Sequence, residues 1–498
     1  MKPSISLPLL RSVMFILTAI LVFSCKETVT EEENEHQYIN DWIKDNMDVY
    51  YYWTDKLPAS SDKTLSPDRY FESLLYTFNS QTAPDGDRFS WIQDDYHSLV
   101  DGLSGVVAQE IGFDYRIYLF QEASDAVVGQ ITYVKKGTSA EQAGLKRGMW
   151  FDKINGVTLT TTNYRSALTI AASSYTITLL DERYNDLGQF AGLTAGKTLT
   201  LTTQSDYAEH PLYLDTVYTL DEQNKVGYLV YHFFAPDNGD ESLAYDRAVN
   251  SAFARFKAAG INHLVLDLRY NSGGYSSSGT YLASMIVPTL DENNVFTYYR
   301  YNTALTSYYL NQYGTKSLNT YFATSIKSDG RVIEALNPVG SDLDGFYVLT
   351  GEYTASASEQ LINGLKAYRN VVLIGDQTYG KNVASISIYE ENDPKNTWGM
   401  QPIVAKFFNK RGQSDFTAGF TPNYQIEDTG APGVLELGDT EESLLGTALA
   451  LIQGRVPAAP TLRSTKLQAK QIPAPGAWHR GLIIDNGPEI PSKIAHIR

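Results

Sequence analysis

Cysteine is almost absent from this sequence: among 498 residues there is one, Cys25. A single cysteine cannot form an intramolecular disulfide, so packing and hydrogen bonds have to hold the fold together. Basic residues are also in deficit, with 40 lysines and arginines against 57 acidic residues and a formal net charge of −17. This balance excludes a general nucleic-acid binder, which needs a basic face. The 7 histidines show no metal-ligand spacing, so we expect neither a metal nor another cofactor.

Long apolar runs are lacking too, and the run at residues 13–23 is too short to cross a membrane. It follows a basic N-terminus, which is the layout of a signal peptide. The Val-Phe-Ser-Cys at 22–25 resembles a bacterial lipobox, in which the cysteine is lipidated. That resemblance implies a signal peptide over 1–24 and a lipid anchor on Cys25. We therefore expect a protein anchored in the bacterial cell envelope, at the outer membrane, on its periplasmic or surface side.

The length suggests about three domains, and the 43% hydrophobic residues suffice for their cores. An acidic stretch without apolar period follows Cys25, and apolar residues at helical spacing come next. The last residues are rich in proline and basic side chains and lack periodicity. We expect a tether over 25–35, a helical domain over 36–104, a mostly β domain over 105–204, an α/β domain over 205–455 and a flexible tail over 456–498.

The β domain carries a long motif at residues 136–156. A short helix ends at Gly144, and Asn155-Gly156 predicts a tight hairpin. The segment resembles a PDZ domain. The resemblance implies a sheet edge that accepts a peptide strand and a glycine turn, here Ile111, Gly112 and Phe113, that holds the peptide's terminal carboxylate. The alternative is a PDZ fold used only as a spacer.

A glycine pair ends the nearly continuous apolar strand at 263–268, which predicts a strand covered on both faces. Gly273 and Gly274 lie where this strand passes into a helix. Backbone amides in such a turn are free to face a negative charge. We interpret the pair as a candidate oxyanion hole, or alternatively as a tight turn alone.

The stretch at 347–387 predicts a strand, a small-residue turn, a helix, a second strand and a Gly-Lys turn. A strand–helix–strand unit of this length brings the ends of its two strands side by side. Ser356 at the start of the helix and Lys381 beyond the second strand are therefore candidates for a nucleophile and its base. A lysine acts as a base when burial lowers its pKa. The Ala357 amide would join Gly273 or Gly274 in binding the oxyanion.

Two other motifs have to be weighed against this interpretation. Residues 375–381 fit G-x-x-x-x-G-K, the start of a nucleotide-binding P-loop. However, Asn382 replaces the Mg²⁺-binding Ser or Thr, and an alternating, strand-like run follows where a P-loop opens a helix. Residues 60–63 match S-x-x-K but have no S-D-N or K-T-G partner, so we treat them as a chance match.

In this order the motifs resemble the S41 family of carboxyl-terminal processing peptidases, over residues 34–454, and its lipoprotein-type members fit best. The resemblance implies a multidomain α/β protein: an N-terminal helical segment, a PDZ-like β domain and a ClpP/crotonase-like catalytic domain. It implies a serine-type endopeptidase acting on proteins or peptides, with Ser356 rather than Ser358 as nucleophile and Lys381 as base. The family's lysine-orienting glutamine is replaced here by Ser385. That substitution supports the rival hypothesis, a catalytically silent, peptide-binding surface lipoprotein.

Overall fold

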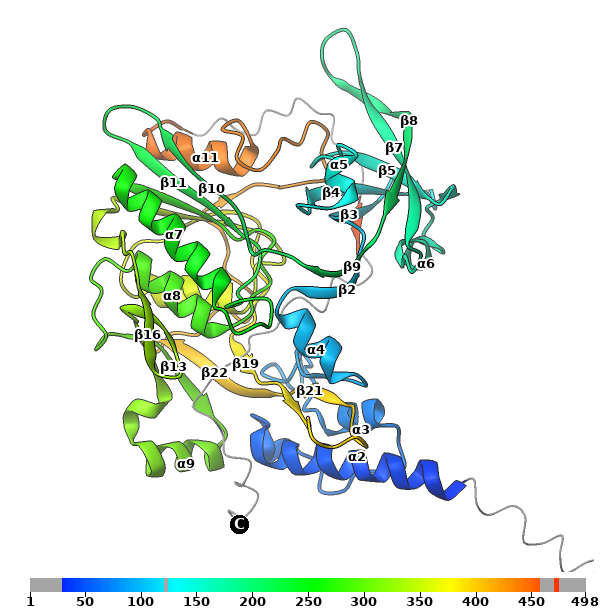
Figure 1. Cartoon of the computed structure of the whole chain (residues 1–498), viewed down its shortest axis with the longest axis vertical. Coiled ribbons are helices and arrows are strands. Elements are labelled where there is room, and N and C mark those ends of the chain that lie inside the picture. Colours follow the sequence, from blue (N-terminus) through cyan, green and yellow to red (C-terminus); the bar gives the residue numbers. More distant parts are fainter. Residues whose placement is uncertain (1–28, 121–123, 457–469, 474–498) are drawn as a thin grey trace, which may run out of the picture. The chain divides into compact units, whose positions relative to one another are not determined.

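The computed structural model describes residues 29–120, 124–456 and 470–473, with side chains from residue 36 onward (Figure 1). Two compact units share these residues. The first contains the described residues up to Tyr96 together with Ile388–Pro402, and the second contains the remaining described residues. The signal peptide expected over 1–24 and Cys25 lie outside the described residues. Within the described part of the chain, no helix has the length and apolar character needed to cross a bilayer.

Helix α2 (Val29–Tyr50) and helix α3 (Pro67–Leu74) form the first unit, with the short helix η1 (Thr54–Lys56) between them. Ile43 and Met47 are buried one turn apart on α2, as their spacing predicts. The helix begins at Val29, inside the expected tether. A three-stranded sheet completes the unit, in the order β1 (Trp91–Gln93), β21 (Gly399–Gln401) and β20 (Ile388–Tyr389).

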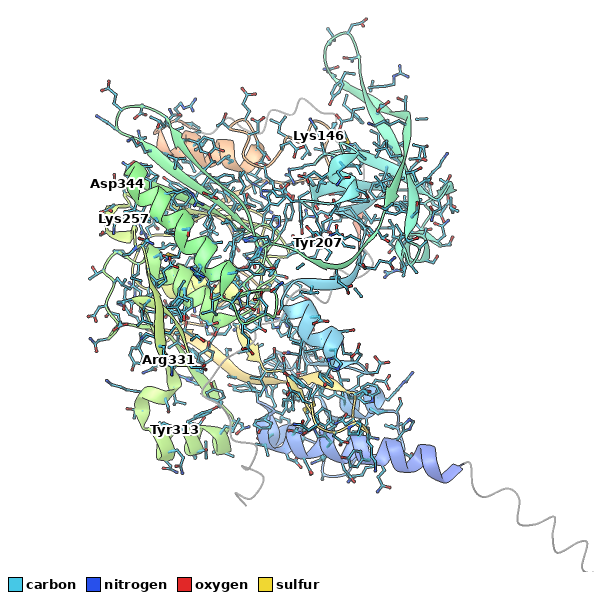
Figure 2. The ribbon with its side chains drawn as sticks, viewed as in Figure 1. Lys146, Tyr207, Lys257, Tyr313, Arg331 and Asp344 are labelled. Carbon is cyan, nitrogen blue, oxygen red and sulfur yellow. The ribbon has the colours of Figure 1, made fainter. Side chains whose placement is uncertain are left out.

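The second unit begins with a β domain at residues 105–208, which follows helix α4 (Tyr96–Leu103). Asn155 and Gly156 both have positive φ (52° and 75°), which confirms the two-residue hairpin between β5 and β6. Within the range expected as a flexible tail, Lys470–Ile472 forms a strand of this sheet, and residues 457–469 and 474–498 lie outside the described residues. The sheet order is β24 (Lys470–Ile472), β3 (Phe113–Leu119), β4 (Val127–Val134), β5 (Trp150–Ile154), β7 (Ser174–Tyr184) and β8 (Phe190–Thr202), and β6 (Val157–Thr158) pairs with β5. The domain also contains the short helices α5 (Ser139–Gln142) and α6 (Tyr164–Leu168). A separate two-stranded sheet consists of β2 (Val106–Glu110) and β9 (Gln204–Ala208). Tyr207 on β9 is labelled in Figure 2 and is buried.

A six-stranded sheet is the centre of the α/β part of the second unit. Its strands run parallel apart from β10, which pairs antiparallel with β11. The order is β10 (Leu212–Thr219), β11 (Lys225–Tyr231), β12 (His263–Asp267), β17 (Gly345–Thr350), β18 (Val372–Gly375) and β23 (Tyr424–Gln425). The expected strand–helix–strand unit is therefore present as β17, α10 (Ala357–Lys366) and β18, with β17 and β18 adjacent.

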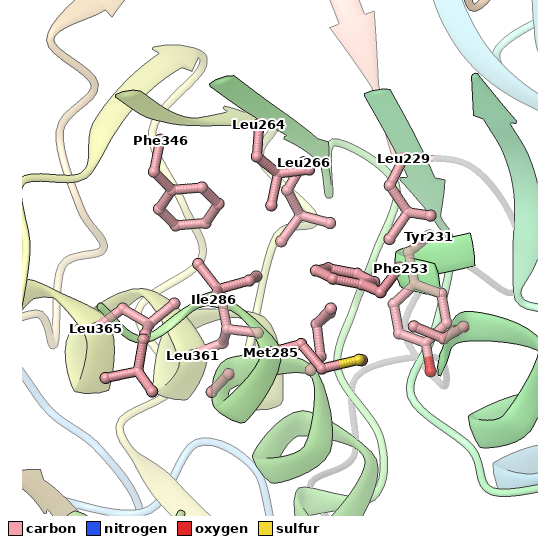
Figure 3. Packing of buried hydrophobic residues seen from close by; sticks show 14 of the residues in the cluster. Leu229, Tyr231, Phe253, Leu264, Leu266, Met285, Ile286, Phe346, Leu361 and Leu365 are labelled. Carbon is pink, nitrogen blue, oxygen red and sulfur yellow. The ribbon is translucent and has the colours of Figure 1, made fainter. Parts of the chain in front are cut away.

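Helices cover both faces of this sheet. Leu264 and Leu266 of β12 point into a core shared with α7 (Ala244–Ala259), α8 (Ser276–Ile286) and α10 (Figure 3). Val265, between them, points into a second core formed with α11 (Ser443–Ile452). The continuous apolar run at 263–268 is therefore explained, as predicted, by a strand that is covered on both faces. Helix α11 starts at Ser443, where the Glu442 carboxylate caps it by accepting from the Leu445 amide at 3.0 Å.

An antiparallel sheet lies further along the chain, in the order β14 (Asn319–Tyr321), β13 (Val295–Tyr301), β22 (Ile403–Asn409) and β19 (Val383–Ser385). The run at 383–389, expected as one strand, divides between β19 in this sheet and β20 in the first unit. The segment at 291–344 also holds α9 (Thr303–Tyr313), η2 (Thr315–Leu318), the hairpin of β15 (Ser325–Ser328) and β16 (Arg331–Ala335), and η3 (Gly340–Asp342).

Candidate active site

Ser356 occupies the turn between β17 and the first residue of α10. Its φ of +67° is unusual for a residue with a side chain and indicates a backbone held under strain, as is common at functional sites. The residue is fully buried, and its Oγ has no hydrogen-bond partner among the described residues. Ser358 differs, because its Oγ donates to the Asn271 carbonyl at 3.1 Å. The geometry therefore favours Ser356 over Ser358 as the available hydroxyl.

The glycine pair lies against this serine although it is remote in sequence. A Cβ on Gly273 would come within 2.5 Å of the Ser356 Cβ, and one on Gly274 within 2.0 Å of the Phe234 carbonyl oxygen. Both residues have positive φ (111° and 131°), so only glycine fits. The Gly273 amide donates to Asn271 Oδ1 at 2.8 Å. The Gly273 amide is therefore engaged within its own turn.

Asn271 connects the elements that meet at Ser356, a role that sequence reasoning missed. Its side-chain nitrogen donates to the Tyr231 carbonyl at the end of β11 at 2.9 Å. Its backbone carbonyl accepts from the Ala355 amide at 3.2 Å and from the Ser358 hydroxyl. One side chain and its own carbonyl therefore fix the glycine turn against the serine turn.

Lys381 lies in the turn before β19 and is 1% exposed. The Glu359 carboxylate holds this turn and the serine turn together. Its Oε1 accepts from the Thr378 hydroxyl at 2.6 Å and from the Gly380 amide at 2.8 Å. Its Oε2 accepts from the Ser356 amide at 3.1 Å and from the Lys381 amide at 2.7 Å. A single carboxylate thus positions the backbones of both predicted catalytic residues.

Glu359 is fully buried, and burial raises its pKa to about 7, although the four hydrogen bonds that it accepts oppose this shift. No cation is among the donors of those four hydrogen bonds. The sequence contained a signal for this residue, because Ser356 and Glu359 have the S-x-x-E spacing of a capping box. That spacing indicates a helix start, and it does not reveal that the same carboxylate reaches a turn 22 residues away.

The P-loop alternative fails on two points of this geometry. A strand, β19, follows Lys381 where a P-loop requires a helix. The amides of Gly380 and Lys381, which would cradle a phosphate, donate to the Glu359 carboxylate.

Ser385, the candidate lysine-orienting residue, is buried in β19 at an irregularity opposite Ile403.

The predicted carboxylate-binding turn of the β domain is already engaged within the chain. Gly112 has φ +97°, and its amide donates to Glu110 Oε1 at 2.8 Å. The other oxygen of Glu110 pairs with Lys135 Nζ at 2.5 Å, and both side chains are buried. The Ile111 carbonyl accepts from the Tyr175 hydroxyl at 2.6 Å. The amide expected to hold a peptide carboxylate therefore binds a carboxylate of the chain itself.

A second buried ionic cluster surrounds Arg269, which follows β12. Its guanidinium group pairs with Asp267 at 2.8 Å, with Glu442 at 2.8 Å and with Asp428 at 2.6 Å. Arg147, from the β domain, pairs with the same Asp428 oxygen at 2.6 Å. Burial opposes the ionisation of Asp428, but the arginines outweigh it and hold the pKa of Asp428 well below its usual range.

Among residues 29–120, 124–456 and 470–473, no group of three or more His, Cys, Asp or Glu side chains is placed to hold a metal ion. The S-x-x-K match at 60–63 carries no chemistry either: Lys63 is exposed and pairs with Asp41 on α2.

Two stretches of the chain match models of a known protein family. A model of peptidase family S41 matches residues 225–426, and a model of the peptidase S41 N-terminal domain matches residues 38–91. The chain is 26% identical over 189 residues (38% of this chain, 34% of the relative) to a chloroplastic C-terminal processing peptidase of Tetradesmus obliquus. It is 27% identical over 226 residues (43% and 44%) to a carboxyl-terminal-processing protease of Picosynechococcus sp.. The chain thus spans less than half the length of these two curated relatives.

Among solved structures, a chain from Bacteroides fragilis that is assigned to the S41 proteases is 26% identical, with a TM-score of 0.65. The match covers 83% of the present chain and 97% of that one. The fold is therefore that of the mixed α/β S41 proteases with an N-terminal domain. The chain belongs to peptidase family S41, a family of serine-type peptidases, as its motifs predicted.

Proposed function

We propose that the protein is a serine-type endopeptidase that uses Ser356 and Lys381 as a catalytic dyad. The observation that carries the proposal is the shared carboxylate: Glu359 Oε2 accepts from the amides of both residues. The unpartnered Ser356 hydroxyl and the buried position of Lys381 support it further. Family membership supports protein or peptide substrates.

In this proposal Lys381 removes the Ser356 proton as Oγ attacks the peptide carbonyl carbon, and the carbonyl π electrons move to oxygen. The amides of Gly274 and Ala357 stabilise that oxyanion, each contributing about 3–4 kcal/mol. Collapse of the tetrahedral intermediate breaks the C–N bond, and Lys381 returns its proton to the leaving amine. Lys381 then deprotonates a water molecule, which hydrolyses the acyl-enzyme and regenerates Ser356. Ser385 is the candidate for orienting the lysine.

The β domain is proposed to present the substrate as a PDZ-like module. An extended segment or C-terminus would add to the edge of its sheet near Ile111, Gly112 and Phe113. The glycine turn directly before β3 supports this assignment.

We further propose that a lipid on Cys25 anchors the chain to the bacterial envelope, because the only cysteine stands at the lipobox position. A Cys25→Ala variant is expected to move from the membrane fraction to the soluble fraction. Unchanged fractionation would exclude the anchor.

The dyad is tested by three substitutions assayed on an unfolded protein substrate. Ser356→Ala and Lys381→Ala are expected to abolish cleavage while leaving the thermal unfolding midpoint close to that of the parent. Ser358→Ala is the matched control, and we expect it to retain activity, since that hydroxyl serves a structural bond. A fluorophosphonate probe that labels the parent but not Ser356→Ala would exclude the rival, a catalytically silent peptide-binding lipoprotein. Full cleavage by either dyad variant would refute the mechanism.

A further inference from the structure

The tail of the chain forms a strand on the β domain. Strand β24 pairs antiparallel with β3, with Lys470 opposite Leu119, Gln471 opposite Tyr118 and Ile472 opposite Ile117. The short red strand beside β3 in Figure 1 is this segment. Strand β3 begins at Phe113, at the end of the Ile111–Phe113 glycine turn, so β24 occupies the outer edge of the strand that leaves this turn.

Side chains and direction resemble those of a bound peptide. Ile472 packs against the hydrophobic core of the β domain. The hydroxyl of Tyr164 on α6 donates to the Pro473 carbonyl at 2.9 Å, so the segment contacts both β3 and α6. Because the pairing is antiparallel, each residue further along the tail lies opposite an earlier residue of β3. The tail therefore runs toward Phe113 and the glycine turn.

The same segment also touches the turn that leads to Ser356. Gln471 Nε2 donates to Glu352 Oε1. Glu352 follows β17 and lies four residues before the proposed nucleophile. Glu352 also lies 3.6 Å from Arg116 Nη2 on β3. Strand β24 is thus in contact with the peptide-binding edge and with the segment that carries Ser356.

We propose that the β3 edge is the substrate-binding edge and that residues 470–473 are its ligand in cis, which an extended substrate segment has to displace. The contact between residues 470–473 and β3 rests on the strand pairing alone. The competition with substrate rests in addition on the proposed peptidase function. A free strand edge offers unpaired amides and carbonyls to any extended chain, so tail and substrate compete for the same hydrogen bonds.

The energetics suit a displaceable ligand. Strand β24 is a three-residue strand at the edge of its sheet, and Lys470 is exposed while Gln471 and Ile472 are half-buried. By contrast, all eight residues of β4 are buried. Covalent attachment gives the tail an effective concentration on the order of millimolar at the β3 edge. A weak contact with a dissociation constant of about 0.1 mM would then lower the apparent affinity for substrate about ten-fold.

The Gly112 turn fits an internal peptide segment better than a free C-terminus. Its amide already binds Glu110, whose charge Lys135 balances, so a substrate carboxylate would first have to replace Glu110. Residues 470–473 pair with β3 as an internal segment of the chain, so no terminal carboxylate has to replace Glu110.

The test measures binding rather than catalysis and uses the full chain carrying Ser356→Ala. The probe is a fluorescent synthetic peptide with the sequence of residues 468–475, and the readout is fluorescence anisotropy. In this background Ile472→Asp is expected to bind the probe about ten-fold more tightly, because a carboxylate at 472 cannot pack on the β-domain core and the edge is vacated. Lys197→Gln is the matched control and is expected to leave binding unchanged, because that exposed residue lies on β8, at the opposite edge of the sheet.

Equal probe affinity of Ile472→Asp and its parent would overturn the proposal. Gln471→Pro provides a second disruption, because proline lacks the amide that a paired strand uses. If both variants lose their near-ultraviolet circular dichroism, the segment is a permanent structural strand and the proposal is wrong. With Ser356 restored, kcat/KM for a peptide substrate should rise about ten-fold in Ile472→Asp, chiefly through KM. If the variants bind the probe as expected but cleave no peptide, the proposal that residues 470–473 are a ligand in cis stands, and only the peptidase function is refuted.

Discussion

The second unit buries carboxylates in two contrasting ways. In the Glu359 cluster (Glu359, Ser356, Thr378, Gly380 and Lys381), the carboxylate accepts four hydrogen bonds from backbone amides and a hydroxyl. In the Arg269 cluster (Arg269, Arg147, Asp267, Asp428 and Glu442), carboxylates pair with guanidinium groups. Burial raises the pKa of Glu359 to about 7. Burial acts in the same direction on Glu442, but the Arg269 charge outweighs it and lowers that pKa.

The difference shows what each cluster contributes. Three amides and a hydroxyl fix the position of Glu359 at a cost in solvation, and in the proposed mechanism this order serves the dyad. Paired guanidinium groups compensate the charge, so the Arg269 cluster joins secondary-structure elements: Arg147 from the β domain, Asp428 after β23 and Glu442 at the start of α11. In the proposed mechanism the first cluster serves the chemistry, whereas the second joins elements of the fold.

Removing the central cation should have the largest effect on stability. Arg269→Met leaves Asp267 and Glu442 buried without their main partner, and we expect a loss of about 3–5 kcal/mol in the free energy of unfolding. Urea denaturation measures it. Arg255→Ala is the matched control, since its pair with Asp215 is partly exposed (55% and 23%) and is worth at most about 1 kcal/mol. Equal losses in the two variants would contradict a structural role for the cluster.

The dependence of stability on pH should have opposite signs in the two clusters. The pKa of Glu359 rises from 4.5 to about 7 on folding, so the native state binds a proton that the unfolded state has released between these values. Stability from this group is therefore complete below pH 4.5 and is lost as pH rises through about 7. Asp428 has a lowered pKa, so its contribution is present above 3.8 and is lost at lower pH.

The contribution of Glu359 to the pH dependence of the free energy of unfolding can be isolated by comparing the parent with Glu359→Gln. From pH 4.5 to 7.5 the parent should lose about 3 kcal/mol of stability relative to the variant, which follows from 1.36 kcal/mol per pH unit. Urea denaturation at several pH values measures the difference. A constant difference across this range would show that Glu359 keeps an ordinary pKa.

The sequence predicted those features that depend on local pattern. The apolar run at 263–268 indicated a strand covered on both faces, and Asn155-Gly156 indicated a hairpin, because both follow from periodicity or backbone preference. The strand–helix–strand unit around Ser356 followed from the same kind of pattern. Since parallel strands connected in this way lie side by side, the pattern also placed Lys381 near Ser356.

Features that depend on long-range contacts were not predictable. Glu359 is visible in the sequence as a capping residue, but its bonds to Thr378 and Lys381 depend on how two turns meet. The tail lacks periodicity, yet residues 470–472 form a strand because an edge of β3 is available more than 300 residues earlier. Hydrogen bonding to a remote edge requires no hydrophobic pattern in the segment that binds.

The smallest expected effect tests whether the Glu359 cluster positions the dyad. In Glu359→Gln an amide NH2 group replaces one carboxylate oxygen, so a donor faces either the amides of Ser356 and Lys381 or the Thr378 hydroxyl and the Gly380 amide. We expect kcat to fall about 10- to 100-fold with KM little changed, because misplacing a catalytic group costs rate rather than substrate affinity. Glu359→Asp should restore less than the parent activity but more than Gln, since it keeps the charge with a shorter reach. Parent-like kcat in Glu359→Gln would mean that Asn271 and the strand framework alone hold Ser356 and Lys381 together, and that the buried carboxylate serves the fold as the Arg269 cluster does.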